Sequence, residues 1–220
     1  MNSRSDDLTY AETLAANIRS SLIKRVEPTT PSKLPFKADS LRNILLYRVS
    51  ELADDSCKLF RLERHVSASI LTRSIIETAA LLFLLNKKIK YTIDYDNITD
   101  IDAFLIKALL GSRNKLDDLM PVAINVLTTI DHTDAHYEGF KDAFEYLCEF
   151  SHPNWAGSLG SYGNIDLNVP GLDLVSAKEK FDGKSGIRAL IISLQIVIDT
   201  YDGIADLLPE FVAICNKNCA

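Results

Sequence analysis

The chain has 220 residues, of which 47% are hydrophobic and 25% charged, and its formal net charge is −6. This is the composition of a globular protein with a sizeable core, and it excludes the disordered and fibrous classes. The acidic excess means that the average surface repels nucleic-acid phosphates and anionic lipids, so RNA binding would need a local basic patch. The four cysteines lack Cys-x-x-Cys spacing, and we expect them to be reduced thiols: Cys57, Cys148, Cys215 and Cys219.

No segment has the composition of an interdomain linker, so we expect one helical domain over residues 1–220. The first residues lack the apolar core of a secretory signal, and the most apolar window, 75–85, is too short to cross a bilayer. We therefore expect a cytoplasmic protein with no membrane partner.

In the first half of the chain, apolar residues recur at helical spacing over about 6–27, where Pro28 ends the pattern. Three prolines then make 28–38 an extended connector. Ser40 suits the N-cap of a second helix, which should run to about residue 60. The third helix, about 65–87, is apolar on nearly every side, and we place it at the centre of a bundle.

Three shorter helices are expected next, at about 100–110, at 121–130 after Pro121, and at 134–150 with an aromatic stripe. From 152 to 184 the periodicity disappears and glycines are frequent, which predicts an irregular loop. A last long helix should cover 186–208, with Pro209 at its end. The predicted fold is an all-α, single-domain bundle of about seven helices with a long glycine-containing loop before the last long helix.

Two charged residues enter the most apolar helix. Arg73 and Glu77 are four residues apart, so their side chains share a helix face and can form an ion pair. Charged side chains are rarely buried unless they are paired. The pair either staples the helix or lies at a groove where it meets a ligand, and the sequence leaves both interpretations open.

A polar segment ends the aromatic helix and begins the loop. Pro153 disfavours helical backbone at His152, so the imidazole should leave the helix at its C-terminal end, where the helix dipole favours a protonated ring. Such a histidine could bind an anion or act as a general acid, or it could only cap the last carbonyls. The neighbouring side chains complete a candidate ligand-binding groove: Tyr146, Ser151, Asn154 and Trp155.

His132 and His136 have the spacing of a metal site and lie beside acidic residues. A helix that starts at Asp134 would put the two histidines on different faces, so a polar turn is favoured over a metal-dependent hydrolase. We predict no metal and no cofactor.

The pattern Arg73-x-x-x-Glu77 on a long helix, followed by an aromatic helix ending in Tyr-Leu-x-x-x-Ser-His-Pro at 146–153, resembles a group of uncharacterised bacterial helical proteins loosely related to the HEPN superfamily. The resemblance covers about 41–155. It implies a helical bundle that is commonly a homodimer, with a metal-independent ribonuclease activity in stress or defence settings. The chain departs from the HEPN signature, an Arg four to six residues before a His, because the nearest arginine before His152 is Arg113.

Two functions remain open. In the first, His152 and Arg73 contact RNA or another anionic ligand, Glu77 orients Arg73, and Trp155 forms an apolar wall; as an enzyme, the chain would use His152, Arg73 and Glu77 as catalytic residues. In the second, the same residues are structural, and a helix face binds a partner protein without catalysis.

Overall fold

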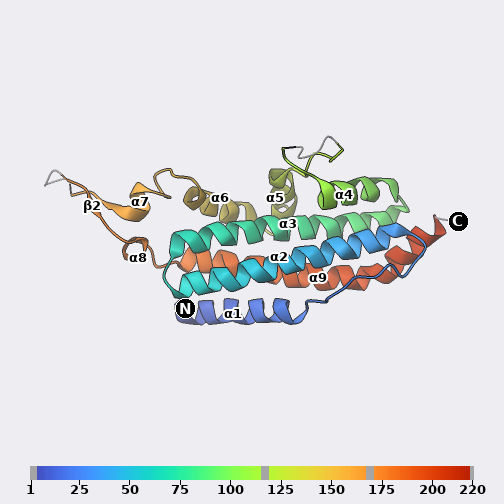
Figure 1. Ribbon diagram of the computed structural model, residues 1–220, viewed down its shortest axis with the longest axis horizontal. Helices are drawn as coiled ribbons and strands as arrows, with labels where there is room; N and C mark the ends of the chain where they lie inside the picture. The colour runs from blue at the N-terminus through green and yellow to red at the C-terminus, as the bar shows by residue number, and fades with distance from the viewer. Residues whose placement is uncertain (1–3, 115–118, 167–170, 219–220) are drawn as a thin grey trace.

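The computed structural model describes residues 4–114, 119–166 and 171–218. These residues form an all-α bundle, as predicted, in which four long helices run side by side (Figure 1): α1 (Arg4–Ser20), α2 (Lys33–Arg61), α3 (His65–Tyr95) and α9 (Lys184–Lys217). The shorter elements all lie between α3 and α9 in the chain: α4 (Thr99–Leu110), α5 (Val126–Asp134), α6 (Phe140–Ser151), α7 (Leu159–Tyr162), β1 (Gly163–Asn164), β2 (Asp173–Leu174) and α8 (Ala177–Lys180).

α3 lies at the centre of the bundle, as its all-round apolarity predicts. It packs against α2 and α9, while α6, α5 and α4 cover its other side in turn from its N-terminal to its C-terminal half (Figure 1). One continuous apolar cluster includes residues of all these helices and of α1. By length and hydropathy α3 could also cross a membrane, but 61% of its most apolar window is buried by its neighbours, as in any core helix.

A buried arginine joins α2 to α9. The Arg42 guanidinium donates from Nε to the Tyr201 carbonyl at 3.0 Å, and its carbon lies 3.6 Å from the centroid of the Tyr201 ring. Its Nη1 lies 3.0 Å from Oδ1 of Asp39, and the Tyr201 hydroxyl donates to Oδ1 of Asn43 at 2.9 Å. The charge is tolerated inside the bundle because it is paired and hydrogen-bonded.

The start of α2 differs from the prediction. The N-cap is Ser32, not Ser40, and its hydroxyl accepts from a backbone amide of the first turn. Pro35 then falls in that first turn, where amides have no partner within the helix and proline is tolerated. Because α1 also ends earlier than expected, at Ser20, the connector covers 21–32 rather than 28–38.

Two helices continue beyond their predicted ends. α9 passes through Pro209 and runs to Lys217, because Phe211 and Cys215 beyond the proline are completely buried. α3 likewise continues past residue 87, since Ile89 has no exposed surface. In both helices tertiary burial outweighs the local signal.

The prediction that Asp134 starts a helix is wrong, since Asp134 is the last residue of α5. Its Oδ1 instead accepts from the backbone N–H of Lys141 at 2.9 Å, so it caps α6 from the preceding turn. Gly139 provides the left-handed backbone, at a φ of 85°, that turns the chain into α6. The expected irregular loop at 152–184 contains α7, the antiparallel β1–β2 pair and α8.

Candidate functional site

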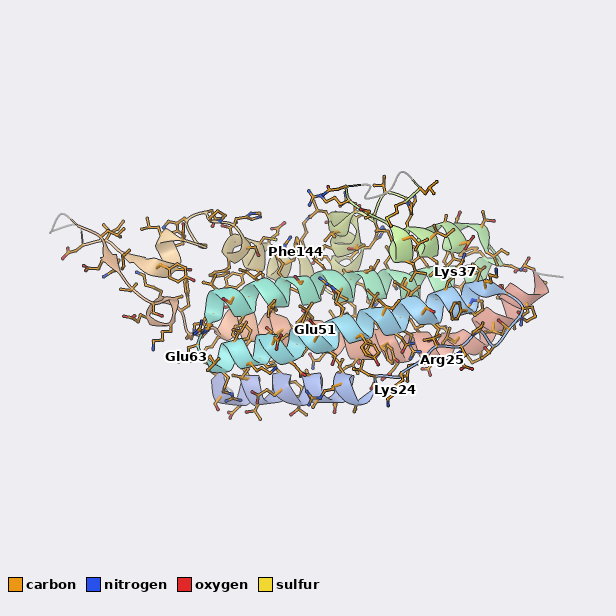
Figure 2. The ribbon with its side chains drawn as sticks, viewed as in Figure 1. Lys24, Arg25, Lys37, Glu51, Glu63 and Phe144 are labelled. Atoms are coloured by element: carbon orange, nitrogen blue, oxygen red, sulfur yellow. The ribbon has the colours of Figure 1, made fainter. Side chains whose placement is uncertain are left out.

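Arg73 is held between α3 and α6. Its Nη2 lies 2.9 Å from Oε1 of Glu77, which confirms the predicted ion pair, and its Nε donates to the Cys148 sulfur at 3.1 Å. The guanidinium carbon lies 5.2 Å from the centroid of the Phe144 ring, where α6 packs over α3 (Figure 2). The side chains of Arg73 and Glu77 are 29% and 23% exposed. Arg73 therefore links α3 to α6, and the Glu77 carboxylate lies close enough to offset its positive charge.

His152 ends α6 as predicted, with extended backbone at φ −104° and ψ 144°. Its ring is exposed, and within the described part of the chain it makes no hydrogen bond or ion pair. The backbone carbonyl oxygen of His152 packs directly on Gly157. A Cβ at that glycine would lie only 2.0 Å from the oxygen, so no larger residue fits there. Cys148, one helical turn before His152, accepts the hydrogen bond from Arg73, and Phe144 one turn earlier packs on the same guanidinium. The structure thus brings Arg73 to Cys148, and no hydrogen bond joins it to His152 among the described residues.

Ser151 and Asn154 are used in building the turn after α6. The Ser151 hydroxyl donates to the Leu147 carbonyl at 3.2 Å. Asn154 donates from Nδ2 to Glu149 at 2.8 Å, while its Oδ1 accepts from the N–H of Gly157 at 3.1 Å. Both polar side chains therefore fix the direction in which the chain leaves α6.

Tyr146 and Trp155 present aromatic surface at the same end of the molecule. Tyr146 is half-buried, its ring lies edge-on to Phe150 at 5.2 Å, and it is hydrogen-bonded to Ser185 at the start of α9. Burial raises the pKa of the Tyr146 hydroxyl, and the bond to Ser185 opposes that shift. Trp155 is 70% exposed, and one side of its indole packs on Gly160. A Cβ at that glycine would lie 3.2 Å from two of the indole carbons.

The segment after Trp155 carries further exposed apolar side chains that the sequence argument did not single out. We call this set, with Trp155, the apolar lobe: Trp155, Leu159, Tyr162, Ile165, Leu172 and Leu174. Figure 1 shows α7 and β2, which carry part of this set, beyond the ends of the long helices.

The apolar lobe is held together by close packing on glycines and by the strand pair. A Cβ at Gly163 would lie 2.6 Å from a Leu159 methyl and 3.0 Å from a Leu172 methyl, so both leucines pack on that glycine. Gly163 pairs across the sheet with Leu174, whose side chain is 82% exposed. Glycines between the apolar residues of a non-helical stretch are a sequence signal for short strands and close backbone packing, whereas the exposure of these side chains depends on the fold.

An acidic stripe on α6 borders the lobe. Asp142, Glu145 and Glu149 are exposed and lie at spacings of three and four residues, so they share one face of the helix. The hydrogen bond from Asn154 to Glu149 joins this face to the loop that carries Trp155.

The metal interpretation gains no support from the geometry. Within the described residues, no group of three His, Cys, Asp or Glu side chains could hold a metal ion. The His136 ring packs instead against Phe83, at a tilt of 32° and a centroid distance of 5.2 Å, and edge-on to Tyr137 at 4.9 Å, while His132 lies exposed on α5.

No family model, no curated protein and no solved structure is similar to this chain.

Proposed function

We propose that this chain is a non-enzymatic interaction module that binds a partner protein through the apolar lobe. The observation that carries the proposal is the exposure of Trp155 and Leu174, at 70% and 82%, in one short segment that also carries Leu159, Tyr162, Ile165 and Leu172 on its surface. Isolated exposed hydrophobic residues are ordinary, whereas a contiguous apolar patch is typical of an interaction site. Tryptophan and tyrosine are the residues most enriched among those that dominate binding energy.

The acidic stripe on α6 supports one kind of partner. A segment that places apolar side chains on the lobe would hold its flanking residues beside Asp142, Glu145 and Glu149. Basic flanking residues would be attracted there, while acidic ones would be repelled. The partner we propose is therefore a protein segment with an apolar anchor and lysines or arginines beside it.

The alternative, in which Arg73 and His152 bind or cleave RNA as the HEPN-like resemblance implies, is less favoured. Glu77 already matches the charge of Arg73, and the carboxylates of α6 stand beside His152 along the same helix. Negative charge at this position raises the electrostatic free energy of an approaching phosphate backbone.

Trp155 is the single tryptophan of the chain, so its fluorescence reports directly on the lobe. The probe is a synthetic amphipathic peptide of leucine and lysine, with a leucine–glutamate peptide of the same pattern as its charge control. We expect the basic peptide to shift the Trp155 emission and the acidic peptide to leave it unchanged. An equal response to both would contradict the charge argument.

Matched variants locate the binding. Leu174→Asp should weaken basic-peptide binding several-fold, because losing the burial of one leucine side chain, roughly 1.5–3 kcal/mol, exceeds the attraction of the added exposed carboxylate, about 1 kcal/mol or less. The control is Leu127→Asp on α5, a leucine that is 59% exposed and lies outside the apolar lobe. This variant should leave the affinity for the basic peptide unchanged. If a fluorescent single-stranded RNA binds instead, and Arg73→Gln abolishes its binding, the RNA alternative replaces this proposal. If Leu174→Asp turns a dimer into a monomer by sedimentation, the occupant is a second copy of the chain.

A further inference from the structure

A groove of about 540 Å³ opens on the side of the bundle where α4 and α5 cover α3. Its volume lies within the ~300–1,000 Å³ typical of small-molecule sites. Most of its wall is apolar and comes from four different parts of the chain: Leu45 on α2, Leu81 on α3, Ala108 on α4, and Ile124 and Val126 at the start of α5. The groove is separate from the apolar lobe, whose residues do not line it.

Two cations line this apolar groove. Arg48 enters from α2 and Lys107 from α4; both are exposed, and no ion pair joins either to a carboxylate among the described residues. The Nε of Arg48 donates to the Thr78 hydroxyl at 3.2 Å, which fixes the side chain while leaving its terminal nitrogens unbonded within the described residues. Glu77 also lines the groove, but its charge is engaged by Arg73 at 2.9 Å. The groove therefore combines an apolar wall with a net positive charge, in a chain whose total charge is −6.

The wall beyond α4 is built before any ligand arrives. The backbone at Gly111 lies directly against the backbone at Lys107 and Ala123. A Cβ at Gly111 would lie 2.2 Å from the Lys107 carbonyl oxygen and 2.7 Å from the Ala123 Cα. The N–H of Ser112 donates to the Pro121 carbonyl at 2.9 Å and ties the two ends of the connection together. A largely preformed wall lowers the entropy lost on binding.

We propose that this groove binds a small amphipathic carboxylate, whose hydrocarbon part lies against Leu45, Leu81 and Ile124 and whose anionic headgroup meets Arg48 and Lys107. An arginine recognises a carboxylate with paired N–H donors, and lysine adds a second point charge. A purely apolar ligand would cover part of both exposed cations without supplying an anion, and a cationic ligand would be repelled by them.

The test is calorimetric titration of the whole chain with decanoate, with decanol and decyltrimethylammonium as neutral and cationic controls of equal chain length. We expect decanoate to bind at one site per chain and more tightly than either control. Equal affinity for decanol would overturn the proposed role of the cations. Failure of decanoate to bind would overturn the ligand class.

Variants place the bound decanoate in the groove. Arg48→Met and Lys107→Met each remove a charge while keeping an apolar stem, and each should weaken binding by about fivefold, the effect of one partly exposed ion pair. Lys90→Met makes the same change on an exposed position of α3 outside the groove and should leave affinity unchanged. Ala108→Phe keeps both charges but fills the groove, and should abolish binding while the circular dichroism spectrum is retained. Decanoate affinities unchanged in Arg48→Met, Lys107→Met and Ala108→Phe would show that the site lies elsewhere.

Discussion

Replacing Arg42 by methionine tests the buried link between α2 and α9. The side chains of Arg42 and Asp39 are 10% and 26% exposed, so removing the guanidinium strands a largely buried carboxylate and the Tyr201 carbonyl. Breaking a buried pair costs about 3–5 kcal/mol. Asp39 keeps its hydrogen bond from Asn43 at 3.0 Å, so we expect the lower end, about 3 kcal/mol. For a chain of this size that lowers the melting temperature by roughly 6–12 °C.

The matched control is Arg61→Met, which makes the same chemical change at the end of the same helix. Arg61 lies 2.6 Å from Glu12, closer than Arg42 lies to Asp39, but its pair is 46% and 39% exposed. Exposed pairs contribute about 1 kcal/mol or less, because water competes for both charges. Urea unfolding followed by circular dichroism measures both variants. Equal midpoints for the two would refute the argument that burial, rather than distance, sets the effect.

Three further predictions concern stability. Phe211→Ala should destabilise the fold by about 3–5 kcal/mol, whereas Ile192→Ala, at a position 46% exposed, should cost far less; urea midpoints compare them. Gly183→Ala should melt at a lower temperature than Gly171→Ala, because Gly183 has a φ of 73° and its Cβ would lie 2.5 Å from the His65 ring, while Gly171 has open space. Burial holds the pKa of His65 below its usual range, so the unfolded chain takes up the proton first and stability falls as the pH drops below about 6.5. His65→Leu should reduce that fall between about pH 7.5 and pH 5 in urea titrations; an unchanged fall would contradict it.

Hydrophobic periodicity was sufficient to predict the fold class and the central place of α3, because a helix that is apolar on every side must be buried, and the neighbouring segments also have helical periodicity. Helix ends were predicted less well. Prolines and caps act locally, and the cost of Pro209 inside a helix, about 3 kcal/mol, is offset by the combined burial of Phe211 and Cys215 beyond it. Ser32 and Ser40 are both suitable N-caps by sequence, and only the packing of Leu34 and Ala38, which are buried, selects the earlier one.

For the candidate site, spacing predicted what lies within one helix. The Arg73–Glu77 pair and the extended backbone at His152 follow from neighbouring residues, and both are present. The contact of Arg73 with Cys148 joins residues 75 positions apart, so it depends on how α6 packs on α3. The charged groove likewise needs α2 and α4 to be adjacent, which spacing within a helix does not encode.

The Arg73–Glu77 pair lies between the two surfaces for which we propose different partners. Its glutamate lines the groove beside Arg48, and its arginine grips α6, the helix that leads into the apolar lobe. The anionic headgroup proposed for the groove would repel the Glu77 carboxylate toward Arg73, so the position of Arg73 against α6 would depend on whether the groove is occupied. Linkage makes such coupling reciprocal: a partner that fixes α6 changes the affinity of the groove by the same factor. A single ion pair thus provides the route by which a small molecule and a protein could sense each other across the central helix.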